Sequence, residues 1–153
     1  MSLRAALLAA ACVLAPGAAQ AISAGTPQLD YLLHCSGCHG PTGAGVPTRG
    51  IPRLQGEIGK LLWVPDGRAY VMQVPGVGNA ALTDAEIARL LNWLPGRLDP
   101  DHLPPDLAPF TTEEVTHYRS TRKGDVLARR AVVVEELAAQ GIELRSYAPP
   151  ASP

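Results

Sequence analysis

Apolar residues recur at helical spacing in several stretches of the chain. The first stretch contains Leu29, Leu32 and Leu33, which fall on one stripe of a helix. Thr26 precedes them and can cap the helix, because a Thr hydroxyl accepts a hydrogen bond from a free backbone N–H. This pattern predicts a helix that runs into Cys35.

A second helix is predicted after Thr83. The sequence Thr83-Asp84-Ala85-Glu86 is a capping box, in which the Thr hydroxyl and the Glu carboxylate satisfy free N–H groups at the start of a helix. Pro95-Gly96 is expected to end this helix. The apolar stripe between these signals consists of Ile87, Leu90, Leu91 and Leu94.

Two further helices are predicted near the C-terminus. Thr111 and Glu114 form a second capping box, which begins a short helix to about Thr121. Residues 125–140 give a longer amphipathic helix that Gly141 can end. The apolar side of this longer helix carries Val126, Val133 and Leu137.

Glycine and proline interrupt the pattern elsewhere. Residues 37–59 are expected to form a long ordered loop, with a short helical turn around 59–62. Residues 69–74 fit either a strand or a short helix, and residues 75–79 read as a loop. Residues 95–110 carry five prolines and are interpreted as a linker or a wrapping arm without regular structure.

The charge of the chain excludes one class of partner. The 153 residues include 13 Lys plus Arg and 14 Asp plus Glu, a net charge of -1 at pH 7. Because no strong positive charge is present, neither nucleic acid nor an anionic membrane is expected as a partner.

The N-terminus has the three parts of a secretory signal peptide. Arg4 gives a positive start, Ala5 to Leu14 is an apolar run, and Ala19-Gln20-Ala21 is a small-x-small cleavage site. The run is shorter than the roughly 20 residues of a membrane span, so a retained anchor is the less favoured alternative. Cleavage is expected to leave Ile22 as the first residue of an exported, periplasmic protein.

Two cysteines remain after cleavage, Cys35 and Cys38, and His39 follows them. This C-x-x-C-H spacing is the attachment pattern of c-type haem: two thiols can each add to one vinyl group, and the next residue supplies an imidazole to the iron. A thiol–disulfide oxidoreductase is one alternative, but that chemistry is expected in a βαβ setting. Half of a zinc site is another, but the four histidines offer no matching second ligand pair.

From Thr26 to Leu94 the chain resembles a class I, monohaem c-type cytochrome. The resemblance consists of the first helix running into the motif, the glycine-rich loop, the segment 50–54, a downstream Met and the closing capped helix. It implies an all-α fold, residues 22–95, around one covalently attached haem c. Covalent haem attachment in bacteria takes place outside the inner membrane, which agrees with the leader.

The resemblance also implies how several residues act. Pro52 is similar to the proline whose carbonyl accepts the proton on the second nitrogen of the proximal His, here His39; Pro47 is the weaker candidate. The first and last core helices are expected to cross, with Leu32 or Leu33 against Leu90, Trp93 or Leu94. Residues 96–110 then form a linker, and residues 111–147 form a helical extension that this core does not require.

Met72 is the favoured sixth ligand of the iron. Met72 is the only Met after the leader and lies before the last core helix, as the distal Met of the family does. Its surroundings differ from the family pattern, so core packing is the alternative. In that case His102 or His117 supplies the sixth ligand, or the position is open. Nearby, Trp63, Arg68 and Tyr70 are candidates to hold the haem propionates or, equally, to pack and face solvent.

The predicted function is that of an exported, soluble electron-transfer cytochrome c rather than an enzyme. A dehydrogenase, an oxidase or another cytochrome is expected as its redox partner. The alternatives are a haem enzyme or gas-binding protein with an open or His-filled sixth position, and a cytochrome subunit of a larger oxidoreductase that docks through the extension.

Overall fold

The computed structural model describes residues 25–121 and 124–145, and the predicted leader lies outside these ranges. Over the described residues the regular elements are helices, with one isolated bridge between Val46 and Ile51. The all-α class predicted from the sequence is therefore confirmed. In chain order the elements are α1 (Pro27–His34), α2 (Ser36–His39), η1 (Pro47–Arg49), α3 (Ile58–Leu61), α4 (Pro65–Gln73), α5 (Pro75–Gly78), α6 (Asp84–Leu98), η2 (Pro100–His102), α7 (Thr112–Ser120) and α8 (Val126–Ala139).

Caps set the starts of the helices as predicted at two places. The Thr26 hydroxyl accepts from the N–H of Leu29, 3.4 Å away, at the start of α1. At α6 the capping box is complete, because Glu86 N–H donates to the Thr83 hydroxyl at 3.3 Å and Thr83 N–H donates to the Glu86 carboxylate at 2.8 Å. Both helices therefore begin where local hydrogen bonding favours it.

The middle of the chain is more helical than the sequence suggested. Residues 69–73 belong to α4 and are not a strand, and the expected loop at 75–79 contains the short helix α5. Prolines open both helices, since Pro65 and Pro75 occupy the first helical position, where a missing N–H costs nothing.

The predicted end of α6 at Pro95 is wrong, because the helix continues to Leu98. Asp99 N–H donates to the Pro95 carbonyl at 2.8 Å, which continues the helical bonding beyond the proline. Leu94 and Leu98 are one turn apart and both buried. The free energy gained by burying these leucines offsets the loss of the one backbone hydrogen bond that a proline removes.

Two clusters of buried apolar side chains hold the helices together. The smaller cluster lies where α1 crosses α6, and its buried members are Tyr31, Ile58, Leu90, Leu94 and Leu98. Tyr31 and Trp93 meet there with ring centroids 6.4 Å apart. The crossing is as predicted, but Leu33 takes no part in it and is 68% exposed. The larger cluster joins α3, α4 and α6 to the C-terminal helices.

The C-terminal extension, which the sequence suggested lies outside the core, packs into this larger cluster. Val115 of α7 and Val133 and Leu137 of α8 are buried beside residues of α4 and α6. As predicted, Val133 and Leu137 lie on the apolar side of α8. A single core therefore spans the domain and the extension.

The segment expected to be a linker is also fixed to the core. Besides the end of α6 it contains η2, and its last residue, Phe110, is buried. The Asn92 side chain bonds both backbone groups of Phe110, donating to its carbonyl at 2.9 Å and accepting from its N–H at 2.7 Å. This segment is a strap across α6, which agrees with the wrapping arm that the sequence suggested as an alternative to a linker, but the end of α6 and η2 give it regular structure that was not expected.

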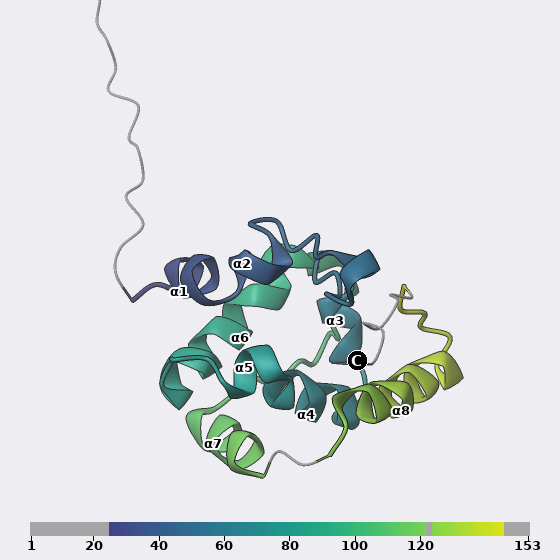
Figure 1. The fold of residues 1–153 in the computed structure, drawn as a ribbon. Helices are drawn as coiled ribbons and strands as arrows, with labels where there is room; N and C mark the ends of the chain where they lie inside the picture. The colour runs from purple at the N-terminus through teal and green to yellow at the C-terminus, as the bar shows by residue number, and fades with distance from the viewer. Residues whose placement is uncertain (1–24, 122–123, 146–153) are drawn as a thin grey trace, which may run out of the picture.

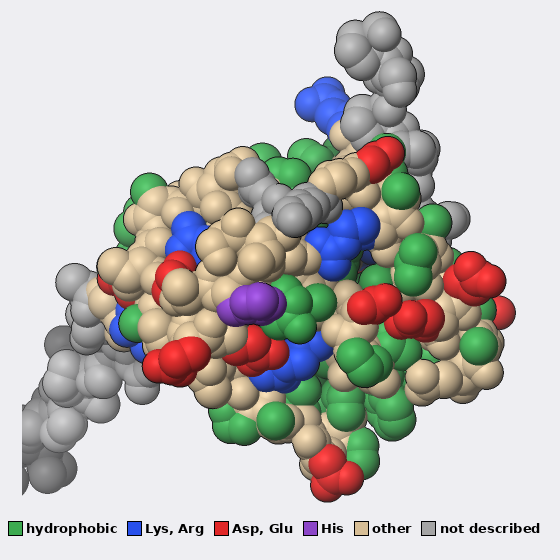
Figure 2. Space-filling model, turned by 90° about the horizontal axis from the view of Figure 1, so that it is seen from below, with side chains coloured by type: hydrophobic (Ala, Val, Ile, Leu, Met, Phe, Trp, Pro, Cys, Tyr) green, Lys and Arg blue, Asp and Glu red, His purple; other side chains and the backbone are tan. Residues whose placement is uncertain are grey.

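Figure 1 shows how the elements are arranged. Helices α1 and α2 lie along the upper edge of the view beside α6, α7 and α8 lie along the lower edge, and α4 and α5 lie between. On the face seen from below, acidic and basic side chains are interspersed among apolar ones (Figure 2). Among residues 25–121 and 124–145, no helix combines the length and apolarity that crossing a membrane requires.

Candidate functional site

The Cys-x-x-Cys-His motif lies at the junction of α1 and α2. Cys35 ends α1, and α2 carries Cys38 and His39. The Ser36 hydroxyl donates to the Leu32 carbonyl at 2.7 Å and so ties the two helices together. The motif is therefore presented on one nearly continuous helical segment, which sets both cysteines and the histidine close to each other.

Both cysteines are free thiols with different surroundings. Cys35 is half-buried and packs against the smaller cluster, whereas Cys38 is exposed. Burial, reinforced by the nearby Asp30 and Cys38, raises the pKa of the Cys35 thiol to about 11. Redox-active cysteines need a lowered pKa, so this environment does not suit a thiol–disulfide oxidoreductase. The βαβ setting of such enzymes is also not found in the described residues.

The imidazole of His39 has one fixed nitrogen. Its Nδ1 lies 3.0 Å from the Pro52 carbonyl oxygen. A carbonyl can only accept, so Nδ1 carries the proton and donates, and Nε2 keeps its lone pair. Burial lowers the pKa of His39, which favours the neutral ring. A neutral imidazole oriented by a backbone carbonyl is the usual form of a histidine metal ligand. Pro52, and not Pro47, makes this contact.

Gly45 is a residue of the site that sequence reasoning missed. Its N–H donates to the His39 carbonyl at 2.8 Å, and its φ of +63° is in the left-handed region. A Cβ here would lie 2.7 Å from the Ile51 oxygen and from the Pro52 carbonyl carbon. Only glycine lets the loop pass so close to the carbonyl that orients His39. The glycine-rich composition of residues 37–59 was the available signal, but it did not single out this position.

Replacing Gly45 by Ala is expected to cost more stability than the backbone conformation alone explains. Gly56→Ala is the matched control, because Gly56 also has positive φ, +71°, but nothing within 4 Å of the added Cβ. Left-handed strain costs about 1–2 kcal/mol at both positions. The clash with Ile51 and Pro52 adds about 1–3 kcal/mol for Gly45→Ala. Urea unfolding measures the loss of unfolding free energy in each variant. Equal losses would contradict the close approach of Gly45 to Ile51 and Pro52.

Tyr31 supports the other side of the motif. Its hydroxyl donates to the Gly40 carbonyl at 2.6 Å, directly after His39 in the chain. The ring is buried against α6. The crossing of α1 and α6 therefore holds both the helix before the motif and the turn after it.

Met72 is fully buried in the core. It is on the last turn of α4 and belongs to the larger cluster, while Cys35 packs against the smaller one. Its side chain is 0% exposed. This placement fits the packing alternative that the sequence left open for Met72.

The polar and aromatic residues near Met72 are engaged within the protein. Arg68 forms a two-bond ion pair with Glu114, Nε to Oε1 and Nη2 to Oε2, both at 2.7 Å. It also donates to two strap carbonyls and lies 3.9 Å over the Phe110 ring. Glu114 is therefore not the second half of a capping box at α7, where only the Thr111 hydroxyl caps. Trp63 is partly exposed, and its Nε1 donates to the His102 carbonyl at 2.8 Å.

The other histidines lie apart from the motif or on the surface. His102, on η2, bonds through Nδ1 to the buried Asp99 carboxylate. His117 is exposed on α7, with its ring against Tyr118. His34 is exposed at the end of α1.

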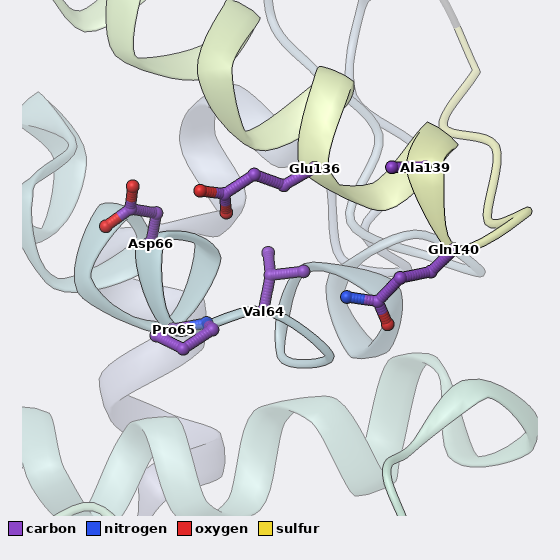
Figure 3. A pocket seen from close by; sticks show the side chains of 6 residues that line it. All are labelled: Val64, Pro65, Asp66, Glu136, Ala139 and Gln140. Atoms are coloured by element: carbon purple, nitrogen blue, oxygen red, sulfur yellow. The ribbon is translucent and has the colours of Figure 1, made fainter.

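A separate pocket lies where α8 crosses the start of α4 (Figure 3). Its lining residues are Val64, Pro65, Asp66, Glu136, Ala139 and Gln140. The Glu136 side chain extends toward Asp66 there, and burial together with Asp66 raises the pKa of Glu136. Over residues 25–121 and 124–145, no three His, Cys, Asp or Glu side chains gather as a metal site. The pocket therefore adds no ligand set to that of the motif.

Comparisons with known proteins add no assignment: the chain matches no protein-family model, no curated protein and no solved structure.

Proposed function

We propose that the protein binds one haem c covalently through Cys35 and Cys38, with His39 as an axial ligand, and serves as a one-electron carrier. The observation that carries this proposal is the contact of 3.0 Å between His39 Nδ1 and the Pro52 carbonyl. It leaves the Nε2 lone pair free for a metal, directly beside two free thiols. An imidazole and two thiols at this spacing suit haem c better than zinc, which takes four ligands.

The two thiols make the covalent attachment. Each sulfur forms a bond to one vinyl carbon while its hydrogen moves to the other vinyl carbon, so no electrons are gained or lost. Cys38 is exposed and Cys35 is half-buried against the smaller cluster, and these two thiols would hold the haem. Tyr31, Gly45 and Pro52 act on this site only by orienting the motif.

When bound, haem supplies a ferric/ferrous couple. The protein takes one electron from a reduced redox protein and passes it to an oxidised one, and no bond of a substrate is made or broken. The partner classes follow from this chemistry: a dehydrogenase as donor, and an oxidase or another cytochrome as acceptor. Hydrogen bonding from His39 to Pro52 increases the basicity of the ligand and so contributes to the reduction potential.

Export belongs to the same proposal. The leader at residues 1–21 directs the chain to the periplasm, where haem is attached to thiols of unfolded chains. The leader and the motif together therefore favour a soluble electron carrier in the periplasm.

Variants of the motif test the attachment. In a bacterial host that attaches haem to exported proteins, the double variant Cys35→Ala/Cys38→Ala is expected to carry no haem after denaturation. Each single variant keeps haem through one thioether, with a shifted pyridine haemochrome band. Ser36→Ala is the matched control, because Ser36 lies between the thiols and its hydroxyl donates to the Leu32 carbonyl, away from the proposed attachment. Haem retained by the double variant would overturn the proposal.

A further inference from the structure

We infer that the Tyr31 hydroxyl is a positioning group that lowers the reduction potential of the bound iron, because it helps to hold the Pro52 carbonyl against His39. The inference rests on the proposed function, since it concerns the imidazole that would bind the iron. A chain of hydrogen bonds from α1 to the Pro52 segment carries it.

The chain of hydrogen bonds begins at Tyr31 of α1. Its hydroxyl donates to the Gly40 carbonyl at 2.6 Å, and the residue is buried, with 2% of its surface exposed. Burial raises the pKa of the phenol, the nearby Cys35 adds to the rise, and a hydrogen bond from Gly43 N–H opposes it. The phenol therefore keeps its proton at neutral pH and remains a donor to Gly40.

The turn at residues 40–43 is held from two helices. Within the turn, Gly43 N–H lies 3.2 Å from the Gly40 carbonyl oxygen, to which it donates. A Cβ added at Gly43, whose φ is +74°, would lie 2.7 Å from the Leu98 side chain of α6 and 3.2 Å from the Gln55 nitrogen. Tyr31 of α1 therefore holds one end of the turn, and the last turn of α6 packs closely against the other.

Gly43 joins this turn to the Pro52 segment. Its carbonyl accepts from the N–H groups of Leu54, at 2.8 Å, and of Gln55, at 3.0 Å. Only one residue separates Leu54 from Pro52, so a backbone fixed at Leu54 restricts where the Pro52 carbonyl can lie. That carbonyl accepts from His39 Nδ1 at 3.0 Å. The Tyr31 hydroxyl therefore acts on the His39 ring through the turn and the Pro52 segment.

The backbone of His39 is held by the same loop. Gly45 N–H donates to the His39 carbonyl at 2.8 Å, and Gly40, which Tyr31 bonds, directly follows His39 in the chain. Loss of the Tyr31 hydroxyl releases the loop at Gly40, so we expect the bond between His39 and Pro52 to weaken. A weaker bond at Nδ1 makes the ligand less basic, and a less basic ligand stabilises ferric iron less.

Tyr31→Phe tests this inference, because it removes the hydroxyl and keeps the buried ring. In the full-length exported holoprotein, we expect the amides of Gly45, Leu54 and Gln55 to exchange hydrogen faster relative to those of α6. Residue-resolved NMR measures this exchange. We also expect a higher reduction potential than in the wild type, measured by redox titration. Haem attachment is expected to be unchanged, with the pyridine haemochrome band at its wild-type position.

Trp93→Leu is the matched control. Trp93 packs against Tyr31 where α1 crosses α6, with ring centroids 6.4 Å apart, so this change loosens the same crossing and keeps the hydroxyl. Urea unfolding measures the loss of unfolding free energy in both variants. In Trp93→Leu we expect the relative exchange of the three loop amides and the reduction potential to equal those of the wild type.

The outcomes separate this inference from the proposed function. A Tyr31→Phe protein that binds haem covalently with an unchanged potential would overturn the inference alone, whether or not its loop amides exchange faster. Equal changes in Tyr31→Phe and Trp93→Leu would also overturn it, because the effect would then belong to the helix crossing. A wild type without covalent haem would overturn the proposed function and the inference together.

Discussion

A chain that ends at Phe110 is expected not to fold. Removing α7 and α8 strips Val115, Val133 and Leu137 from the larger cluster, where each is 0–1% exposed. Loss of one such side chain in a core costs about 2–5 kcal/mol, and a whole domain is stable by only about 5–15 kcal/mol. Circular dichroism and urea unfolding of the truncated chain are expected to show no cooperative transition.

A matched pair of substitutions on α8 tests the same claim within the full chain. Leu137→Ala is expected to lower the free energy of unfolding by about 2–5 kcal/mol, because Leu137 is 0% exposed. Leu127→Ala, on the same helix at 40% exposure, is expected to change it by less than about 0.5 kcal/mol. Equal effects of the two variants, or a folded truncated chain, would mean that the extension is an appendage after all.

Gly67→Ala is expected to destabilise the protein strongly. Gly67 lies in the first turn of α4, where an added Cβ would overlap the Leu61 carbonyl oxygen and lie 2.9 Å from its carbon. Backbone atoms cannot move aside as the end of a flexible side chain can. We expect a loss of about 3 kcal/mol or more, since overpacking against a fixed backbone is costly.

Gly96→Ala is the control for Gly67→Ala. Gly96 also lies within a helix, α6, but an added Cβ there meets nothing within 4 Å. Ala is the better helix former, so this change is expected to stabilise the protein by about 0.4–1 kcal/mol. Thermal unfolding of the two variants measures the difference. A Gly67→Ala protein as stable as Gly96→Ala would contradict the close packing of α3 on α4.

Local signals of the sequence predicted much of this fold. The cap at Thr26 and the capping box at Thr83 act within one turn of a helix, so the sequence alone is enough to predict them. The stripe of Val133 and Leu137 likewise depends only on helical spacing. The C-x-x-C-H motif is local in the same sense, because its three functional side chains lie within five residues.

Two features of the helices depend on long-range packing and could not be predicted from local sequence. The proline at position 95 is a reliable stop signal by itself, but burial of Leu94 and Leu98 carries α6 past it. The Thr111–Glu114 pair has the spacing of a capping box, yet the Glu114 carboxylate is taken by Arg68, 46 residues away in sequence. No local pattern shows such a competition.

The candidate site shows the same division. The contact between His39 and Pro52 was implied by family resemblance and joins residues 13 positions apart, a separation that spacing alone could not resolve. Gly45 was missed because its role depends on how close the loop comes to Pro52. Met72 was favoured as the iron ligand from its order in the chain, and order says nothing of its burial in the larger cluster.

The mass of the exported wild-type protein under denaturing conditions tests the central claim most directly. We predict a chain that begins at Ile22 and is heavier than the polypeptide by one haem, with the pyridine haemochrome spectrum of two thioether bonds. A chain of polypeptide mass alone, with Cys35 and Cys38 both open to alkylation, would contradict it.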